Sequence, residues 1–233
     1  MKNLLSIALL TLVIFSSSSA FSQMGTEEND SKNYLTNRAI TIVAAERNFS
    51  GSAYENKEFV SGYVFKDGKP LASNVALRYN AKRDEFEVKK TLGSADTSGR
   101  VLKRSDEIYV KILNKVYVYS PLKEGISKGG YFIVIHEGDT YSLYKKLTKQ
   151  FIEGREAINS ITRDTPPAYQ DKEVFYLVNN ASENFTELPK SRKRKLKVFE
   201  NNKKAVKAFV KENRLNLNKD YDLAKLVKYY DTL

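Results

Sequence analysis

Residues 77–90 read LRYNAKRDEFEVKK, and this stretch decides how the centre of the chain is expected to fold. Apolar and polar side chains alternate on both sides of a polar run, which is the pattern of two half-buried strands. A turn over residues 80–83 places Leu77 opposite Phe86 on one face of the pair. A slip of one residue would turn these apolar side chains to solvent. The stretch therefore predicts an antiparallel hairpin with one buried and one exposed face.

The exposed face of this predicted hairpin carries charges. The same register sets Arg78 opposite Glu85, with Glu87 on their face and Asp84 directly after the turn. A pair of carboxylates is what a glycoside hydrolase uses. However, exposed carboxylates beside cations keep low pKa values, whereas a general acid needs a raised pKa. We therefore interpret these charges as the outer face of a hairpin, and a carboxylate-based glycan hydrolase is the alternative.

Similar patterns on both sides of this stretch predict a largely antiparallel sheet. Asp67-Gly68 lies between two apolar runs, and this dipeptide is a strong hairpin signal because both turn residues must reach positive φ. A further hairpin is expected around Asn114, central in the sheet because both its faces are apolar or tyrosine-rich. Residues 172–178 are expected to form the last strand. The links between strands are too short for parallel crossovers.

The composition changes at Pro189, after which helical spacing replaces alternation. Three short helices are expected over residues 189–200, 202–214 and 219–231, with Asn218 as the N-cap of the last. A stripe at helical spacing comprises Leu223, Leu226, Val227 and Tyr230. The predicted class is α+β: an antiparallel, curved sheet followed by a small C-terminal unit of about three short helices.

The N-terminus has the anatomy of a secretory signal peptide. A basic start precedes the mostly apolar run of residues 4–15, and Ala20 and Ser22 fit the small positions before a cleavage site at Gln23. The apolar run is shorter than the roughly 20 residues that a membrane-spanning helix needs. The chain contains no cysteine, so its core is expected to hold without disulfides. We therefore expect an exported protein of the periplasm or cell surface.

The chain is accordingly divided into four parts. These are a signal peptide (1–22), a flexible N-terminus and lead-in segment (23–57), an antiparallel β domain (58–188) and a basic helical unit (189–233).

Motifs of known catalytic and cofactor sites are absent from the sequence. His136 is the only histidine, and the expected hairpin places it opposite Tyr141, with Val134 opposite Leu143, as a packing or rim residue. The sequence contains no Gly-x-Ser-x-Gly, HExxH, Walker A or Gly-x-Gly-x-x-Gly motif. We therefore assign no catalytic residue, no cofactor and no metal ligand.

Positive charge is the most informative functional feature. The chain carries a net charge of +11. From Thr186 to the end there are 14 Lys and Arg against six Asp and Glu, a balance of +8. The densest part, KSRKRKLK, supplies the candidate anion-binding residues Lys190, Arg192, Lys193, Arg194, Lys195 and Lys197. Outside the cytosol the anionic partners are lipid headgroups, lipopolysaccharide, acidic glycans and acidic proteins, and nucleic acid is disfavoured. The alternative is a solvated helix face that aids solubility.

The segment LRYNAKRDEFEVK and the ending LAKLVKYYDTL resemble a group of exported, uncharacterised bacterial envelope proteins, whose signals end much like the AFSQ found here. The resemblance implies a Gram-negative-type source and an envelope location, and it brings no known activity or cofactor. Together these observations predict a non-enzymatic envelope protein that binds a protein partner or an anionic surface. The alternative is an envelope glycan hydrolase.

Overall fold

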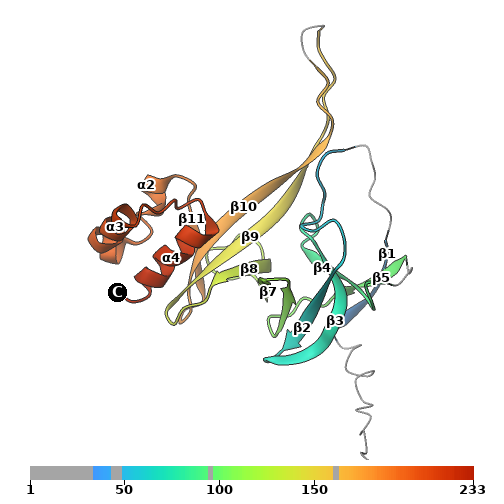
Figure 1. The fold of residues 1–233 in the computed structure, drawn as a ribbon, viewed down its shortest axis with the longest axis horizontal. Coiled ribbons are helices and arrows are strands. Elements are labelled where there is room, and N and C mark those ends of the chain that lie inside the picture. The colour runs from blue at the N-terminus through green and yellow to red at the C-terminus, as the bar shows by residue number, and fades with distance from the viewer. Residues whose placement is uncertain (1–33, 43–48, 94–96, 160–162) are drawn as a thin grey trace, which may run out of the picture.

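The computed structural model describes residues 34–42, 49–93, 97–159 and 163–233, so the predicted signal peptide lies outside it. Within these ranges the chain forms one sheet of eleven strands followed by short helices (Figure 1). The strands are β1 (Leu35–Thr41), β2 (Val60–Lys66), β3 (Lys69–Asn80), β4 (Glu85–Lys89), β5 (Ser98–Leu102), β6 (Ile108–Ile112), β7 (Lys115–Ser120), β8 (Gly130–His136), β9 (Tyr141–Ile152), β10 (Ala168–Asn179) and β11 (Asn184–Leu188). The helical elements are α2 (Arg192–Lys195), the 3₁₀ turn η1 (Glu200–Asn202), α3 (Lys203–Glu212) and α4 (Asp220–Tyr230).

The prediction of an antiparallel sheet followed by short C-terminal helices is confirmed, although the fold is mostly β rather than α+β. The strand order is β1-β5-β4-β3-β2-β6-β7-β8-β9-β10-β11, so β1 and β11 form the two edges and the sheet is not closed. β1 lies in the lead-in segment and pairs with β5. β11 extends the sheet beyond the strand that was expected to be the last.

Two of the predicted hairpins are confirmed. Asp67 and Gly68 join β2 to β3 with φ angles of 49° and 76°, so both residues take the left-handed conformation that such a turn requires. β6 and β7 pair around Asn114 and stand in the middle of the strand order. Local turn chemistry is sufficient to place both connections.

The hairpin at residues 77–90 forms, but the predicted register was wrong by two residues. Leu77 lies opposite Val88, and Arg78 lies opposite Glu87. The turn occupies residues 81–84, because the side-chain Oδ1 of Asn80 accepts the Arg83 N–H at 3.0 Å. A shift of two residues keeps every side chain on its predicted face and changes only its partner.

The register of the β8–β9 hairpin was also wrong. Val134 lies opposite Tyr144, and His136 lies opposite Leu143, with an irregularity between the two pairs. His136 is half-buried at the end of β8, as expected for a rim residue. The additional residue in β8 changes the pairing beyond it, as a β-bulge does.

A carboxylate from the C-terminus holds the turn that follows β8. Asp231, directly after α4, accepts the backbone N–H groups of Asp139, Thr140 and Tyr141 at 2.8, 2.9 and 2.7 Å. Partial burial raises the pKa of Asp231, but these three donors outweigh burial, so the pKa lies below its usual value. The contact ties the helical unit to the sheet.

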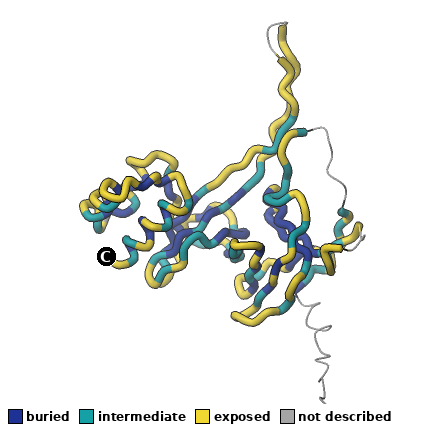
Figure 2. Tube along the Cα trace, in the orientation of Figure 1, coloured by how far each residue is buried: buried dark blue, intermediate teal, exposed yellow. Residues whose placement is uncertain are grey.

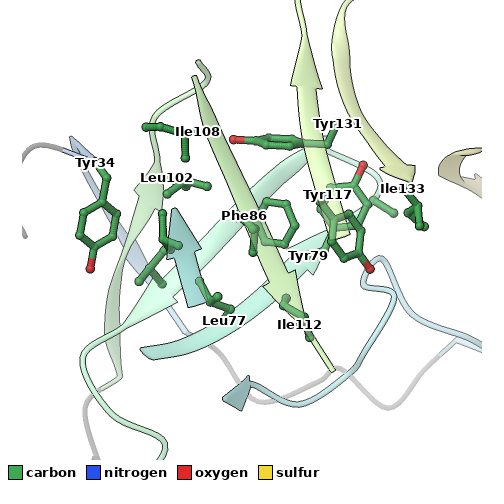
Figure 3. Close-up of a cluster of buried hydrophobic side chains, with 14 of the residues drawn as sticks. Tyr34, Leu77, Tyr79, Phe86, Leu102, Ile108, Ile112, Tyr117, Tyr131 and Ile133 are labelled. Atoms are coloured by element: carbon green, nitrogen blue, oxygen red, sulfur yellow. The ribbon is translucent and has the colours of Figure 1, made fainter. Parts of the chain in front are cut away.

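The first core lies inside the curved half of the sheet, where side chains from several strands converge (Figure 3). Aromatic rings dominate it. The Phe86 ring stands edge-on to Tyr117 and Tyr131, with centroids 5.1 and 4.9 Å apart, a geometry that aromatic pairs prefer. Apolar neighbours include Leu77, Val64 and Val110.

A second core forms where the helices cover one face of the sheet around β8–β10, as the dark-blue stretches of Figure 2 show beside α4. All four residues of the predicted stripe on α4 are buried there, together with Leu143 and Leu177 from the sheet. A smaller cluster around Phe132 and Phe185 covers the opposite face. The outer ends of β9 and β10 extend away from both cores as an exposed ribbon (Figures 1 and 2).

The helical unit is less regular than predicted. The first expected helix shrinks to the four residues of α2 and the turn η1. Lys219, rather than Asn218, takes the N-cap position of α4. No helix in the described part of the chain is both long enough and apolar enough to cross a membrane.

Candidate functional site

The charged face of the central hairpin is buried, which corrects the expectation that it is exposed. Arg78 is 7% exposed and Glu87 is 2% exposed. The Nε and Nη2 atoms of Arg78 donate to Oε2 of Glu87 at 3.2 and 2.6 Å. Both donors share one carboxylate oxygen, and these hydrogen bonds are charge-assisted and sheltered from water.

Residues 54–59 cover this ion pair from outside the hairpin. Tyr54 donates its hydroxyl to Oε1 of Glu87 at 3.0 Å, and its ring lies 3.7 Å from the Arg78 guanidinium carbon. The ring of Phe59 lies 4.4 Å from the same carbon, and Arg78 donates to the Lys57 carbonyl at 3.1 Å. Sequence reasoning missed this cover because nothing local to the hairpin indicates it.

The two neighbouring acids are also paired. Asp84 accepts from Lys146 at 2.6 Å and from the Tyr79 hydroxyl at 2.7 Å. Burial lowers the pKa of Lys146 below its usual value, and the attraction of Asp84 offsets only part of that effect. Glu85 accepts from Arg38 of β1 at 2.5 Å.

These contacts give the three carboxylates a structural role. Each one forms an ion pair with a cation on another strand or on the facing strand of the hairpin. None of the three lies in the hollow between the sheet and the helical unit. Among the described residues no group of three or more acidic or histidine side chains could hold a metal ion. The hydrolase alternative therefore gains no support from the acids that suggested it.

The basic segment lies on the surface of the helical unit, with one exception. Five of the six predicted cations are exposed: Lys190, Arg192, Lys193, Arg194 and Lys197. Within the described residues no carboxylate lies in ion-pair distance of any of the five. Four lysines of α3 are exposed as well: Lys203, Lys204, Lys207 and Lys211. The helical unit thus presents positive charge that the described part of the chain does not neutralise.

Lys195 does not belong to this surface, which corrects its assignment as an anion-binding residue. It is 2% exposed, and its ammonium donates to the Leu217 carbonyl at 2.5 Å and to Oδ1 of Asn218 at 3.2 Å. Burial lowers the pKa of Lys195. The side chain joins α2 to the loop before α4, so its charge serves the packing of the helical unit.

A neutral hollow opens between the sheet and the helical unit. Its sheet side comprises Tyr141, Leu177, Asn179, Asn184 and Thr186, with Ser182 at the turn. The helical unit contributes Val198, Asn201 and Tyr230. Hydroxyl and amide groups predominate, and no lining side chain is charged. The lining comes from distant parts of the chain, so no local sequence signal could have indicated it.

No protein family, curated protein or solved structure matches this chain.

Proposed function

We propose that this chain is an exported, non-enzymatic envelope protein that binds an anionic envelope surface through its basic helical unit. The observation that supports this most directly is the set of five exposed cations without carboxylate partners in the described residues. The signal-peptide pattern of residues 1–22 supports export.

The charge density is sufficient for surface binding. A Lys or Arg near an anionic membrane contributes about 1 kcal/mol. Five such cations within eight residues act on the same surface, and the exposed lysines of α3 add to their field. This attraction weakens with salt, because the Debye length falls to about 8 Å at physiological ionic strength.

Charge reversal on the basic segment tests the proposal. The variant Lys193→Glu/Arg194→Glu should bind vesicles of phosphatidylcholine and phosphatidylglycerol about 30-fold more weakly or worse at low salt, measured by co-sedimentation. Lys69→Glu/Lys111→Glu is the matched control, since it makes the same charge change at exposed positions of the sheet. If both variants lose vesicle binding equally, the effect comes from net charge and not from the basic segment. If Lys193→Glu/Arg194→Glu binds vesicles like the wild type, the proposal is contradicted.

Export is tested separately. Cell fractionation should recover the chain outside the cytosol, and mass spectrometry should identify a mature N-terminus at Gln23. Recovery of uncleaved chain in the cytosol would contradict the proposed location.

A further inference from the structure

The neutral hollow contains side-chain amides that form no hydrogen bond within the described residues. Asn179 is committed, because its Oδ1 accepts the N–H groups of Ala181 and Ser182, each at 3.1 Å. In contrast, the side chains of Asn184 and Asn201 form no hydrogen bond with any described residue. An amide offers two donors and an acceptor on one rigid plane, which matches adjacent hydroxyl groups of a ligand.

Two tyrosine rings complete the hollow. Tyr141 and Tyr230 lie with centroids 4.8 Å apart and a tilt of 44°. Burial, together with the hydrogen bond to Tyr141, raises the pKa of Tyr230 to about 12. Tyr230 is buried, so the lining offers mainly uncharged hydroxyl and amide groups, which suit the hydroxyl edges of a neutral ligand.

The hollow also adjoins the basic segment along the chain. Thr186 and Val198, which both line it, lie on either side of residues 190–197. Lys197 directly precedes Val198, so their Cα atoms are about 3.8 Å apart. Lys197 is therefore the exposed cation next to the hollow along the chain.

We propose that the hollow is a saccharide subsite, so that the anion this protein recognises is an acidic glycan. The inference rests on the proposed binding of an anionic surface and names its chemical class. The cations bind the carboxylate or phosphate groups of the glycan, and the hollow binds a sugar ring beside them. A bare phospholipid surface offers charge to the cations and no sugar ring to the hollow.

The test compares polyanions with and without sugar. Alginate, polygalacturonate and lipopolysaccharide are the saccharide probes, and polyacrylate and phosphatidylglycerol vesicles are the sugar-free probes. We expect the wild type to bind at least one saccharide probe more tightly than polyacrylate at equal charge concentration. Asn184→Ala/Asn201→Ala should weaken that binding about tenfold and leave binding to the sugar-free probes unchanged.

Controls separate this inference from the proposed function. Asn114→Ala removes an exposed amide in the β6–β7 turn and should change nothing, and thermal unfolding verifies that each variant folds. If the hollow variant binds every saccharide probe like the wild type, the saccharide subsite is wrong while surface binding stands. A wild type that prefers no saccharide probe overturns the subsite as well. If Lys193→Glu/Arg194→Glu has no effect on any probe, the proposed function itself fails.

Discussion

Lys195 tests whether the buried and exposed cations of the basic segment have different roles. The structure assigns Lys195 to the packing of the helical unit, whereas Lys193 is exposed and belongs to the proposed anion-binding surface. The buried ammonium of Lys195 donates to Leu217 and Asn218, whereas Lys193 is exposed on the same short helix. Lys195→Met keeps most of the aliphatic stem and removes the charge and both hydrogen bonds. Lys195→Glu places a carboxylate against two acceptor oxygens. Lys193→Glu makes the same charge reversal in solvent.

The contacts set the size of each effect. Asn218 is exposed and can bond to water, but Leu217 is 3% exposed, so Lys195→Met leaves its carbonyl without that donor. An unsatisfied buried acceptor costs about 1–3 kcal/mol. An uncompensated buried charge costs about 3–5 kcal/mol, which is the expectation for Lys195→Glu. Lys193→Glu should stay within about 0.5 kcal/mol of the wild type.

Thermal unfolding measures these differences directly. In a chain of this size 1 kcal/mol corresponds to about 2–4 °C in Tm. Lys195→Met should therefore lower Tm by about 2–12 °C, and Lys195→Glu by more, while Lys193→Glu leaves it nearly unchanged. Folded Lys195→Met should also bind anionic vesicles like the wild type. A wild-type Tm for Lys195→Met, or weaker vesicle binding by the folded variant, would refute the structural role assigned to Lys195.

Three further results are expected. Arg78→Met leaves the buried carboxylate of Glu87 without its cation and should lower the free energy of unfolding in urea by about 3–5 kcal/mol; a smaller loss when both residues become Met would identify the pair itself as the cause. Asp231→Ala should lower the free energy of unfolding by about 1–3 kcal/mol at neutral pH. Because the pKa of Asp231 is lowered in the folded state, this difference from the wild type should disappear as the pH falls through that folded pKa. Burial, with neighbouring carboxylates, raises the pKa of Tyr79 and Tyr117 above the usual 10.0. Their contribution to the free energy of unfolding is therefore fully present below about pH 10. Stability should then decrease by about 1.4 kcal/mol per group for each pH unit above about 10; normal tyrosinate absorbance in the folded protein at that pH would contradict this.

The sequence predicted one part of the candidate site, and only the folded structure revealed the other. Composition alone located the basic segment, because charge density is a property of the chain and not of its folding. Composition could not separate Lys195 from its five exposed neighbours, since only the loop before α4 supplies its two acceptors. The hollow had no local signal, because Asn184 and Asn201 come together only when the helical unit packs on the sheet.

The sequence by itself located the hairpins of the sheet and the helices α3 and α4, but it did not indicate β11 and it made the first helix too long. Alternation, the Asp67-Gly68 dipeptide and the stripe on α4 act through contacts between near neighbours in the chain, so a local pattern is sufficient. The tertiary structure alone decided the burial of the charged face, whereas the two hairpin registers depend on the Asn80–Arg83 contact and on the irregularity in β8. In the central hairpin that burial comes from residues 54–59. In the second hairpin the turn is held by Asp231, about 90 residues away. Partners that distant satisfy buried polar groups without leaving any trace in the local pattern.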